Sequence, residues 1–280
     1  HVEAGLRSHN RHMPEEINRI IADEISQLLF CPTQEAVSNL TAEGIGQENT
    51  QAFKEFTFND QAVFRTGDVM YDSVLFNKAL AVKKSDILSR LDIDAASYIL
   101  GTLHRAENTD DPKRLKNIIK AYNDIASQGS LIVLPLHPRT HKYIGQLEDA
   151  DRLFHSNIRI IDPVGYLDML LLEEKADMIL TDSGGVQKEA FFLGTPCITL
   201  RDETEWVETI QAGWNTIAGA DPEKILTAYA HAKNLKDGCP PYINSLPLKN
   251  MARPDVNDLY GDGHAAEKIL SILEQFLFCS

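Results

Sequence analysis

The chain has 280 residues, and its 27 basic and 41 acidic side chains give a formal net charge of −14. This length predicts about two domains, and 43% hydrophobic with 24% charged residues is typical of a globular protein rather than a disordered one. The negative balance argues against a nucleic-acid or anionic-membrane binder, because such proteins cluster Lys and Arg. A polyanionic substrate would need a locally basic pocket.

The first block of the chain is residues 1–68. Residues 1–7 resemble the end of a strand, Glu15 to Leu29 has the spacing of one long amphipathic helix, and Thr33 to Leu40 that of a shorter one. Residues 69–96 are helical and charged in pattern, which suits a connector.

From Ser97 onward, short apolar runs alternate with amphipathic stretches, which predicts βαβ units and a parallel sheet with right-handed crossovers. The predicted strands are Tyr98–Leu103, Leu131–Leu136, Ile158–Ile161, Ala176–Leu180 and Cys197–Leu200. Helices are predicted after Asp111-Pro112, at Gly165–Glu174 and at Gly185–Leu193. We expect residues 97–260 to form one domain with an irregular excursion from Lys233 to Asp258. Residues 261–280 should end in the amphipathic helix Ala265–Phe278.

The cysteines Cys31, Cys197, Cys239 and Cys279 are scattered and form no Cys-x-x-Cys pair. This spacing predicts neither a structural zinc site nor a disulfide framework, and it fits a reducing compartment. No apolar run approaches the roughly 20 residues of a membrane span. We therefore expect a cytoplasmic protein without a metal site.

Polar and charged groups follow four of the predicted strands, and ligands of parallel sheets bind outside the carboxyl ends of the strands. These groups are His104, His137 and Arg139, the segment Ser183–Glu189, and Arg201 with Glu205. Because they converge on an otherwise acidic chain, the sequence predicts an active site at this edge, where several cations would meet a diphosphate.

Ser183-Gly184-Gly185 opens a predicted helix and has the composition of an anion cradle, with backbone N–H groups and the helix dipole favouring negative charge. A serine N-cap followed by two turn-forming glycines is an equally good interpretation. A buried Glu189 would suit paired ribose hydroxyls, whereas an exposed Glu189 would be a solvated helical charge.

The first block carries Glu3, and the acids Glu15 and Glu16 at the start of a helix, with Arg7 and Arg19 nearby. Two carboxylates beside arginines could serve as general acid and base if their surroundings separate their pKa values. Acids in a first helical turn are also favoured by the macrodipole alone. We favour that interpretation for Glu16 and leave Glu3 and Glu15 open. The i+4 spacing predicts that Arg19 holds the Glu15 carboxylate.

Six segments in one order resemble the non-hydrolysing UDP-N-acetylglucosamine 2-epimerase family: residues 1–7, Pro14–Arg19, Thr102–Arg105, Thr181–Glu189, Arg201–Glu205 and Tyr260–Gly263. The resemblance implies a GT-B-like α/β fold, with two Rossmann-like domains, parallel sheets and the ligand cleft between them. It also implies that the first domain is incomplete in this chain, which begins after the family's opening segment and one catalytic acid. The terminal helix would return to the first domain.

The resemblance assigns roles residue by residue. Glu3 and Glu15 would transfer protons, and His104 is counted with them as catalytic. Ser183 and the following backbone of Gly184 and Gly185 would bind the diphosphate, and Glu189 the ribose. Arg19, Arg201 and Glu205 would contact the substrate, together with the two cations His137 and Arg139 placed above.

The implied reaction is epimerisation at C2 of a UDP-sugar by anti elimination and re-addition of UDP, which needs neither a nicotinamide nor a metal. We therefore expect a UDP-sugar substrate, no cofactor, no nucleic-acid or membrane partner, and a homodimer. Arg201–Glu208, Thr102–Asp111 and Leu136–Thr140 look more like the branch acting on UDP-2,3-diacetamido-2,3-dideoxyglucuronate than like the UDP-N-acetylglucosamine enzymes.

Three other functions remain open at this point. A retaining GT-B glycosyltransferase would share the ribose carboxylate and the diphosphate site, but it would not require Glu3 and Glu15 beside Arg19. A hydrolysing epimerase would release free sugar and UDP. A truncated chain would bind UDP and catalyse nothing.

Overall fold

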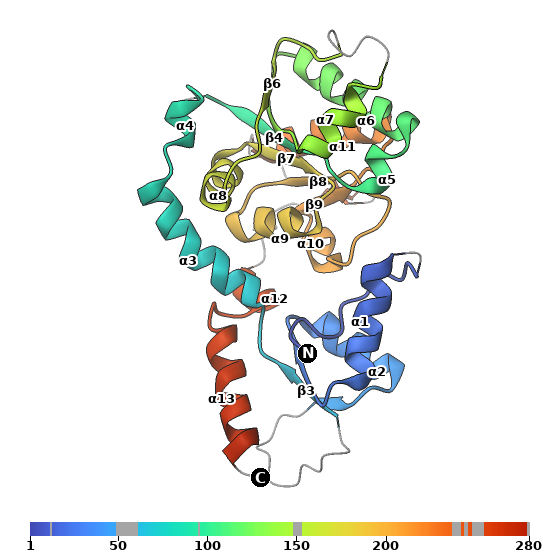
Figure 1. Ribbon diagram of the computed structural model, residues 1–280, viewed down its shortest axis with the longest axis vertical. Coiled ribbons are helices and arrows are strands. Elements are labelled where there is room, and N and C mark those ends of the chain that lie inside the picture. Colours follow the sequence, from blue (N-terminus) through green and yellow to red (C-terminus); the bar gives the residue numbers. More distant parts are fainter. Residues whose placement is uncertain are drawn as a thin grey trace. The chain divides into compact units, whose positions relative to one another are not determined.

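The computed structural model describes residues 1–11, 13–48, 61–94, 96–147, 153–236, 242–243, 246–247 and 255–278. The chain divides into two compact units (Figure 1). Unit 1 comprises His1–Phe76 and Pro254–Ser280, and unit 2 comprises Asn77–Arg253. The division falls inside helix α3 (Val69–Lys84).

Unit 2 is built on a parallel sheet of six strands with the order β6-β5-β4-β7-β8-β9. The strands are β4 (Tyr98–Thr102), β5 (Leu131–Pro135), β6 (Ile158–Ile161), β7 (Met178–Thr181), β8 (Cys197–Thr199) and β9 (Asn215–Ile217). This confirms the predicted parallel sheet and adds β9. The strand order reverses between β4 and β7, and doubly wound sheets bind ligands at such a switch point.

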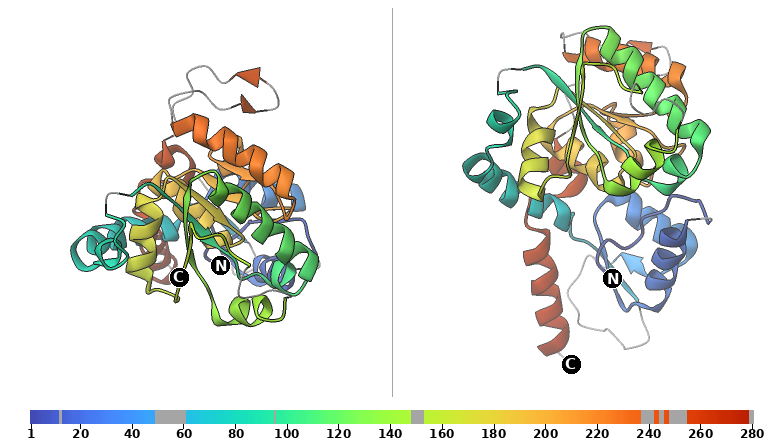
Figure 2. Two further views of the ribbon diagram at one scale, coloured as in Figure 1. Left: turned by 90° about the horizontal axis from the view of Figure 1, so that it is seen from above. Right: turned by 45° about the horizontal axis from the view of Figure 1, so that its top comes forward.

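Helices cover both faces of this sheet (Figure 2), because successive strand side chains point to opposite faces. On one face, Ile99 and Ile132 pack with α6 (Pro112–Ser127) and α11 (Pro222–Lys236). On the other face, Leu100 packs in a core that includes residues of α4 (Ile87–Arg90), α8 (Tyr166–Lys175) and α9 (Gly184–Leu193). The short helices α5 (Ala106–Thr109), α7 (Pro138–Ile144) and α10 (Val207–Gln211) follow strands of the sheet.

The helix start predicted at Asp111-Pro112 is confirmed as the amino end of α6. Asp111 caps the helix by accepting hydrogen bonds from the backbone N of Lys113 at 2.8 Å and of Arg114 at 3.2 Å. Pro112 occupies the first turn, where a missing N–H costs no helical bond.

Unit 1 holds a smaller parallel sheet with the order β1-β3-β2. Its strands are β1 (Leu28–Cys31), β2 (Gln47–Glu48) and β3 (Ala62–Arg65), and its helices, besides the first part of α3, are α1 (Pro14–Ile25), α2 (Gln34–Glu43), α12 (Val256–Tyr260) and α13 (Ala265–Phe278). The terminal helix confirms the predicted range and packs Ile269 against Leu28, Phe30 and Phe64 of the sheet.

Two expectations for unit 1 are wrong. The helix predicted over Glu15–Leu29 ends at Ile25, and the following residues form β1, whose four side chains are all buried. Pairing with β3 decides this, because a short apolar run carries no period that separates strand from helix. The strand end predicted over residues 1–7 is wrong in extent: within the described part of the chain, Val2 forms one isolated parallel bridge with Phe30, and the segment forms no strand longer than that.

The excursion predicted over Lys233–Asp258 lies largely outside the described residues. Within it, α11 continues to Lys236, and β10 (Tyr242–Ile243) pairs with β11 (Leu246–Pro247) in an antiparallel ladder. Among the helices that the structure describes, none combines the length and the apolar character required to cross a membrane.

Candidate active site

One buried carboxylate joins the carboxyl ends of β4 and β7 at the switch point. Asp182 has no exposed surface, and both of its oxygens lie 3.1 Å from the backbone N of His104. Its Oδ2 also accepts hydrogen bonds from the backbone N of Arg105 at 2.9 Å and from Asn108 Nδ2 at 3.2 Å. These donors fix the loop after β4, so that the half-exposed His104 ring stands beside β7, with Nδ1 3.4 Å from Asp182 Oδ1.

The amino end of α9 lies at the same switch point. Ser183 Oγ caps the helix by accepting a hydrogen bond from the backbone N of Val186 at 3.4 Å. A side chain at Gly184 would place its Cβ 2.9 Å from Glu205 Oε1 and 3.6 Å from Arg201 Nη1. Gly184 therefore lets the loop after β8 close onto the first turn of α9, whose N–H groups have no helical acceptor.

Arg201 and Glu205 form a buried ion pair beside that helix end. Arg201 is 1% exposed, and its Nη1 lies 3.1 Å from Glu205 Oε2, close enough for a salt bridge although the two groups are not aligned for a hydrogen bond. Their loop is held by Thr204 Oγ1, which donates to Gln187 Oε1 of α9 at 2.7 Å. The structure thus brings together Ser183, Gly184, Arg201 and Glu205.

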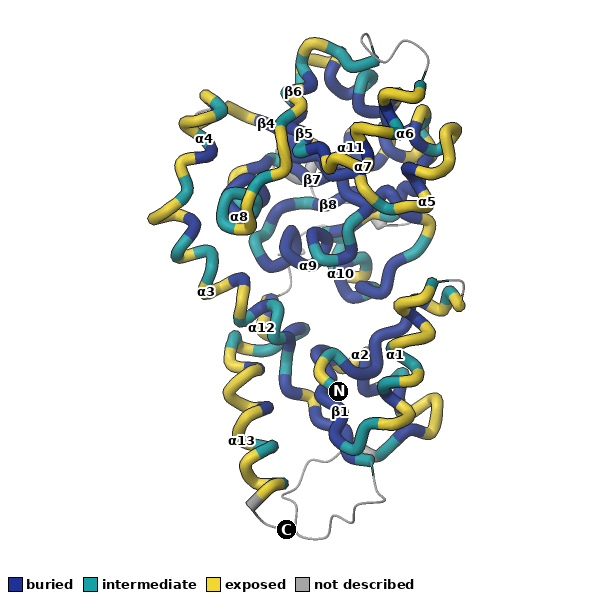
Figure 3. The backbone as a smooth tube through the Cα atoms, in the orientation of Figure 1, coloured by how far each residue is buried: buried dark blue, intermediate teal, exposed yellow. Residues whose placement is uncertain are grey.

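Glu189 is buried, so it is not a solvated helical charge. It lies in α9, which is buried along almost its whole length (Figure 3). Burial raises the pKa of Glu189, and interactions with the Tyr166 hydroxyl, Glu173 and the Lys188 charge partly offset this effect. The carboxyl group of Glu189 is therefore held among polar partners in a site that excludes water.

The two cations that follow β5 differ in their surroundings. His137 caps α7, accepting a hydrogen bond from the backbone N of Arg139 at 3.2 Å, and it lines the same hollow as His104. The Arg139 guanidinium lies 2.9 Å from both carboxylate oxygens of Asp110, whose pKa it lowers. Arg139 is therefore engaged in an ion pair with Asp110, whereas His137 lies at the edge of the sheet and borders the hollow.

A hollow of about 300 Å³ opens beside these groups, at the carboxyl ends of β4 and β5 and the first turn of α9. His104 and His137 border it, and apolar side chains supply most of the remaining lining: Leu103, Pro135, Pro163, Val164, Met169 and Val186. Its mostly apolar lining suits the faces of a ring, and the two histidines offer polar contacts at its border.

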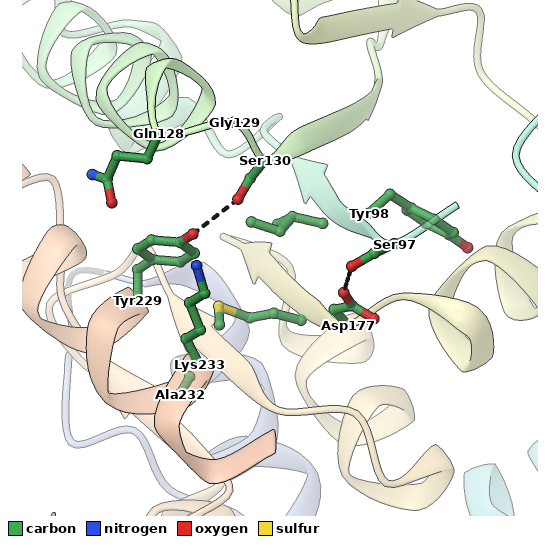
Figure 4. A pocket seen from close by; sticks show the side chains of 11 residues that line it. Ser97, Tyr98, Gln128, Gly129, Ser130, Asp177, Tyr229, Ala232 and Lys233 are labelled. Atoms are coloured by element: carbon green, nitrogen blue, oxygen red, sulfur yellow. Dashed lines mark hydrogen bonds between the residues drawn. The ribbon is translucent and has the colours of Figure 1, made fainter. Parts of the chain in front are cut away.

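A second cavity of about 540 Å³ lies at the amino ends of the same strands (Figure 4). Four of its polar side chains bond in pairs: Ser97 donates to Asp177, and Ser130 lies 2.8 Å from the Tyr229 hydroxyl. The Lys233 ammonium lies 5.9 Å from the centre of the Tyr229 ring. Gln128 follows the carboxyl end of α6, where the helix dipole is negative. A diphosphate is therefore better accommodated at the opposite edge, beside Ser183.

In unit 1, Glu16 is buried and holds the backbone of the preceding loop. The sequence pattern favours the helix dipole alone as the explanation for this acid. Glu16 is 1% exposed and accepts hydrogen bonds from the backbone N of Ser8 at 3.0 Å and of His9 at 2.9 Å. Arg19 Nη2 pairs with Glu16 Oε2 at 2.9 Å, one position away from the predicted partner Glu15, which is exposed. Burial alone would raise the pKa of Glu16, but the bonds from Ser8 and His9 and the Arg19 charge outweigh it and lower that pKa.

Glu3 is partly buried and holds a left-handed backbone with φ of 65°. Glu15 follows Pro14 in the first turn of α1. In the sequence, Glu3 precedes and Glu15 follows Ser8 and His9, the two residues whose backbone N–H groups Glu16 holds.

The buried pair Arg7 and Asp23 was not predicted. Arg7 Nη1 lies 2.7 Å from Asp23 Oδ2, and His1 Nδ1 lies 2.6 Å from Asp23 Oδ1. The one signal in the sequence is that Asp23 follows Glu16 by seven residues, two helical turns, which places both acids on one face of α1.

This cluster predicts an acid sensitivity. Burial would raise the pKa of Asp23, but hydrogen bonds from His1 and Arg7 and the Arg7 charge outweigh it and lower the pKa. The stabilisation that the ionised Asp23 gives the folded state is therefore complete above the unfolded-state pKa of about 3.9. It is lost as the pH falls through the lower folded-state pKa.

We expect Asp23→Asn to reduce the free energy of unfolding at neutral pH and to make its decline below about pH 4 less steep, as measured by urea unfolding followed by circular dichroism. Glu24→Gln, an exposed neighbour, is the control. Unchanged acid dependence in Asp23→Asn would contradict this expectation.

The profile of a family described as UDP-N-acetylglucosamine 2-epimerase matches residues 1–274. The chain is 44% identical over 275 residues to a UDP-N-acetylglucosamine 2-epimerase homolog of Methanococcus maripaludis, covering 98% of this chain and 68% of that protein. It is 42% identical to the UDP-2,3-diacetamido-2,3-dideoxy-D-glucuronate 2-epimerase of Pseudomonas aeruginosa, covering 98% and 67%.

Solved structures show the same similarity. The Methanocaldococcus jannaschii UDP-GlcNAc 2-epimerase in complex with UDP-GlcNAc and UDP has a TM-score of 0.77 and 40% identity, over 98% of this chain and 68% of that one. The Neisseria meningitidis enzyme bound to UDP-GlcNAc has a TM-score of 0.75 and 30% identity, over 98% and 69%. These similarities confirm the GT-B-like α/β fold class that the sequence predicted.

Proposed function

This chain belongs to the UDP-N-acetylglucosamine 2-epimerase family, and we propose that it inverts C2 of a UDP-linked 2-acetamido sugar while keeping the UDP linkage. The observation that carries this proposal is the convergence of Ser183, Gly184, Arg201 and His104 at the switch point of the unit 2 sheet. The substrate is UDP-N-acetylglucosamine or its 2,3-diacetamido-uronate analogue.

The nucleotide can be assigned to unit 2 group by group. The diphosphate meets the first-turn N–H groups of α9, with the Arg201 cation and the His104 ring beside them. The ribose hydroxyls donate to Glu189, five residues further along the helix than Gly184. The uracil ring occupies the hollow beside Val186, where apolar side chains cover its flat faces and its polar edge can meet the histidines at the border.

The C2 proton of the sugar is not acidic, so its direct removal and return would be slow. In an anti elimination, a carboxylate takes this proton, the C1–O bond breaks, and UDP departs with the bonding electrons to leave a C1–C2 double bond. The cationic groups around the diphosphate stabilise the charge that develops on UDP. Re-addition of UDP to C1, with a proton delivered to the opposite face of C2, completes the epimerisation.

We assign the proton transfers to Glu3 and Glu15, because two carboxylates in different environments can serve opposite faces of the sugar. Arg19 supports them by organising the loop through Glu16. Exclusion of water until UDP has returned separates this reaction from hydrolysis.

Proton NMR in deuterated water, with each of the two candidate UDP-sugars, tests the proposal. Deuterium at C2 with the UDP linkage retained is the expected result. Free sugar and UDP would instead indicate a hydrolysing enzyme, transfer to an added acceptor would indicate a glycosyltransferase, and an unchanged spectrum would indicate a chain that only binds UDP.

Binding of UDP by calorimetry tests the assignment of Glu189 separately. We expect Glu189→Ala to weaken binding by roughly 1–3 kcal/mol, the scale of a hydrogen bond to a buried charged group. Glu174→Ala is a matched control, because Glu174 also lies in unit 2 but faces Lys78 at 3.2 Å. Equal affinities of wild type and Glu189→Ala would remove Glu189 from the site.

We also propose that the enzyme is a cytoplasmic homodimer. Among the described residues, the buried Cys31 and Cys197 are not joined in a disulfide, which fits a reducing compartment. The dimer rests on the family membership.

A further inference from the structure

Glu173 is a buried acid that the proposed reaction does not use. It lies in α8 and is 1% exposed, and both of its carboxyl oxygens are shielded from solvent. Within the described part of the chain, neither oxygen accepts a hydrogen bond from an N–H or O–H donor. An ionised carboxylate in this position would be strongly destabilising, because nothing replaces its hydration.

Helices α8 and α9 pack in one core through Leu172 and Ala190, and the Glu189 carboxyl group of α9 interacts directly with that of Glu173. Two carboxylates side by side cannot both ionise at low cost, whereas a carboxylic acid can donate its proton to a carboxylate. A neutral Glu173 therefore satisfies both groups at once: its O–H is the donor, and Glu189 is the acceptor.

We propose that Glu173 is a positioning residue that stays protonated and donates a hydrogen bond to Glu189, holding that carboxylate ionised and oriented for the ribose hydroxyls. This inference rests on the proposed role of Glu189 in nucleotide binding. The proposal adds Glu173 to the site. The sequence pattern at the strand ends could not include this residue, because Glu173 lies in α8 and Glu189 lies in α9.

The charges around the pair agree with one shared proton. Burial and the Glu189 charge raise the pKa of Glu173 well above its usual range. Burial also raises the pKa of Glu189, and the Tyr166 hydroxyl, Glu173 and the Lys188 charge partly offset that effect by favouring the ionised form. On β8, burial raises the pKa of the facing Cys197 thiol to about 12, so it stays neutral.

Two cations on elements packed against α8 are engaged elsewhere. Lys78 of α3 pairs with Glu174 at 3.2 Å, and Arg90 of α4 pairs with Asp168 at 2.7 Å. Asp177, which precedes β7, accepts a hydrogen bond from Ser97. A proton shared by the pair therefore removes one of its two negative charges, and the Lys188 charge acts on the remaining one at Glu189.

The first test follows stability against pH and does not involve the nucleotide. Because the folded-state pKa of Glu173 is raised, the folded chain keeps a proton that the unfolded chain releases above about pH 4.3. Wild-type stability should therefore decline as the pH rises from about 5 to 8, relative to Glu173→Gln, in which the amide cannot ionise. We expect the melting temperature of Glu173→Gln minus that of wild type to increase over this range. Glu174→Gln is the control, and a constant difference for Glu173→Gln would overturn the proposal.

The second test measures how strongly the protein prefers UDP over 2′-deoxy-UDP, which lacks one ribose hydroxyl. Glu173→Leu removes the donor and should reduce this preference roughly tenfold, the scale of one hydrogen bond to a charged group. Glu173→Gln retains an N–H donor and should preserve the preference. Pyrophosphate, which has no ribose, should bind equally to all three proteins.

The two tests separate this inference from the proposed function. If Glu189→Gln abolishes the preference but Glu173→Leu keeps it, the positioning role of Glu173 is wrong and Glu189 remains on the ribose. If Glu189→Gln keeps the preference, the ribose assignment itself is wrong, and the positioning role is overturned with it. If Glu173→Leu does not fold, the pH profile of Glu173→Gln still tests the proton on Glu173, without which the proposal fails.

Discussion

Replacing Glu15 with Gln should lower the turnover of the enzyme roughly 10²–10⁴-fold, the usual contribution of a positioned acid or base. Glu15 stands in the first turn of α1, directly after Pro14, and its side chain is exposed, so it can reach a substrate. Gln keeps the shape and the hydrogen-bonding capacity of the side chain but cannot take a proton. UDP affinity should barely change, because the proposed nucleotide contacts belong to unit 2.

Deuterium exchange at C2 distinguishes a lost base from other defects. Exchange should fall in parallel with turnover in Glu15→Gln. Glu35→Gln is a matched control, because Glu35 is also an exposed acid in the first turn of a unit 1 helix. If exchange continued at the normal rate while net epimerisation stopped, Glu15 would not be the base on that face, and Glu3 would be the candidate.

Replacing Asp182 with Asn should reduce the free energy of unfolding by about 2–4 kcal/mol and weaken UDP binding more than tenfold. The buried carboxylate accepts from the backbone N of His104 and of Arg105 and from Asn108 Nδ2. An amide has one acceptor oxygen, so its NH₂ group must meet one of these donors. The loop that carries His104 would then lose its attachment to β7.

Urea unfolding and calorimetry with UDP measure the two effects of Asp182→Asn. Asp202→Asn is the control, because this carboxylate is 68% exposed and its ion pair with Arg114 should contribute less than about 1 kcal/mol. A folded Asp182→Asn protein with normal UDP affinity would show that the His104 loop does not contribute to the nucleotide site.

Local patterns in the sequence predicted most of unit 2. The five apolar runs from Tyr98 to Leu200 become five of its six strands, because a parallel strand covered on both faces requires a continuous run of apolar residues. The chain order of strands and helices also placed polar groups at one edge, since all parallel strands end there. The structural role of Asp182, which lies between Thr181 and Ser183, could not be predicted. The spacing of polar residues in the sequence does not reveal which of them is buried.

Contacts between residues far apart in the sequence were decided by the tertiary structure alone. Leu28–Cys31 is a strand because β3 pairs with it, and the run itself would fit the end of a helix. Helix α1 buries Glu16 and Asp23 and leaves Ile17 and Ile21 exposed, the reverse of what hydrophobicity predicts.

The same holds for the charged partners in the candidate site. Arg139 is 29 positions from Asp110, Arg7 is 16 from Asp23, and the Glu173 and Glu189 carboxyl groups meet between two helices. A helical period or strand alternation specifies which residues share a face of one element. It cannot specify which side chain of another element meets that face, because packing of the whole unit decides whether a buried charge finds a partner or keeps a proton.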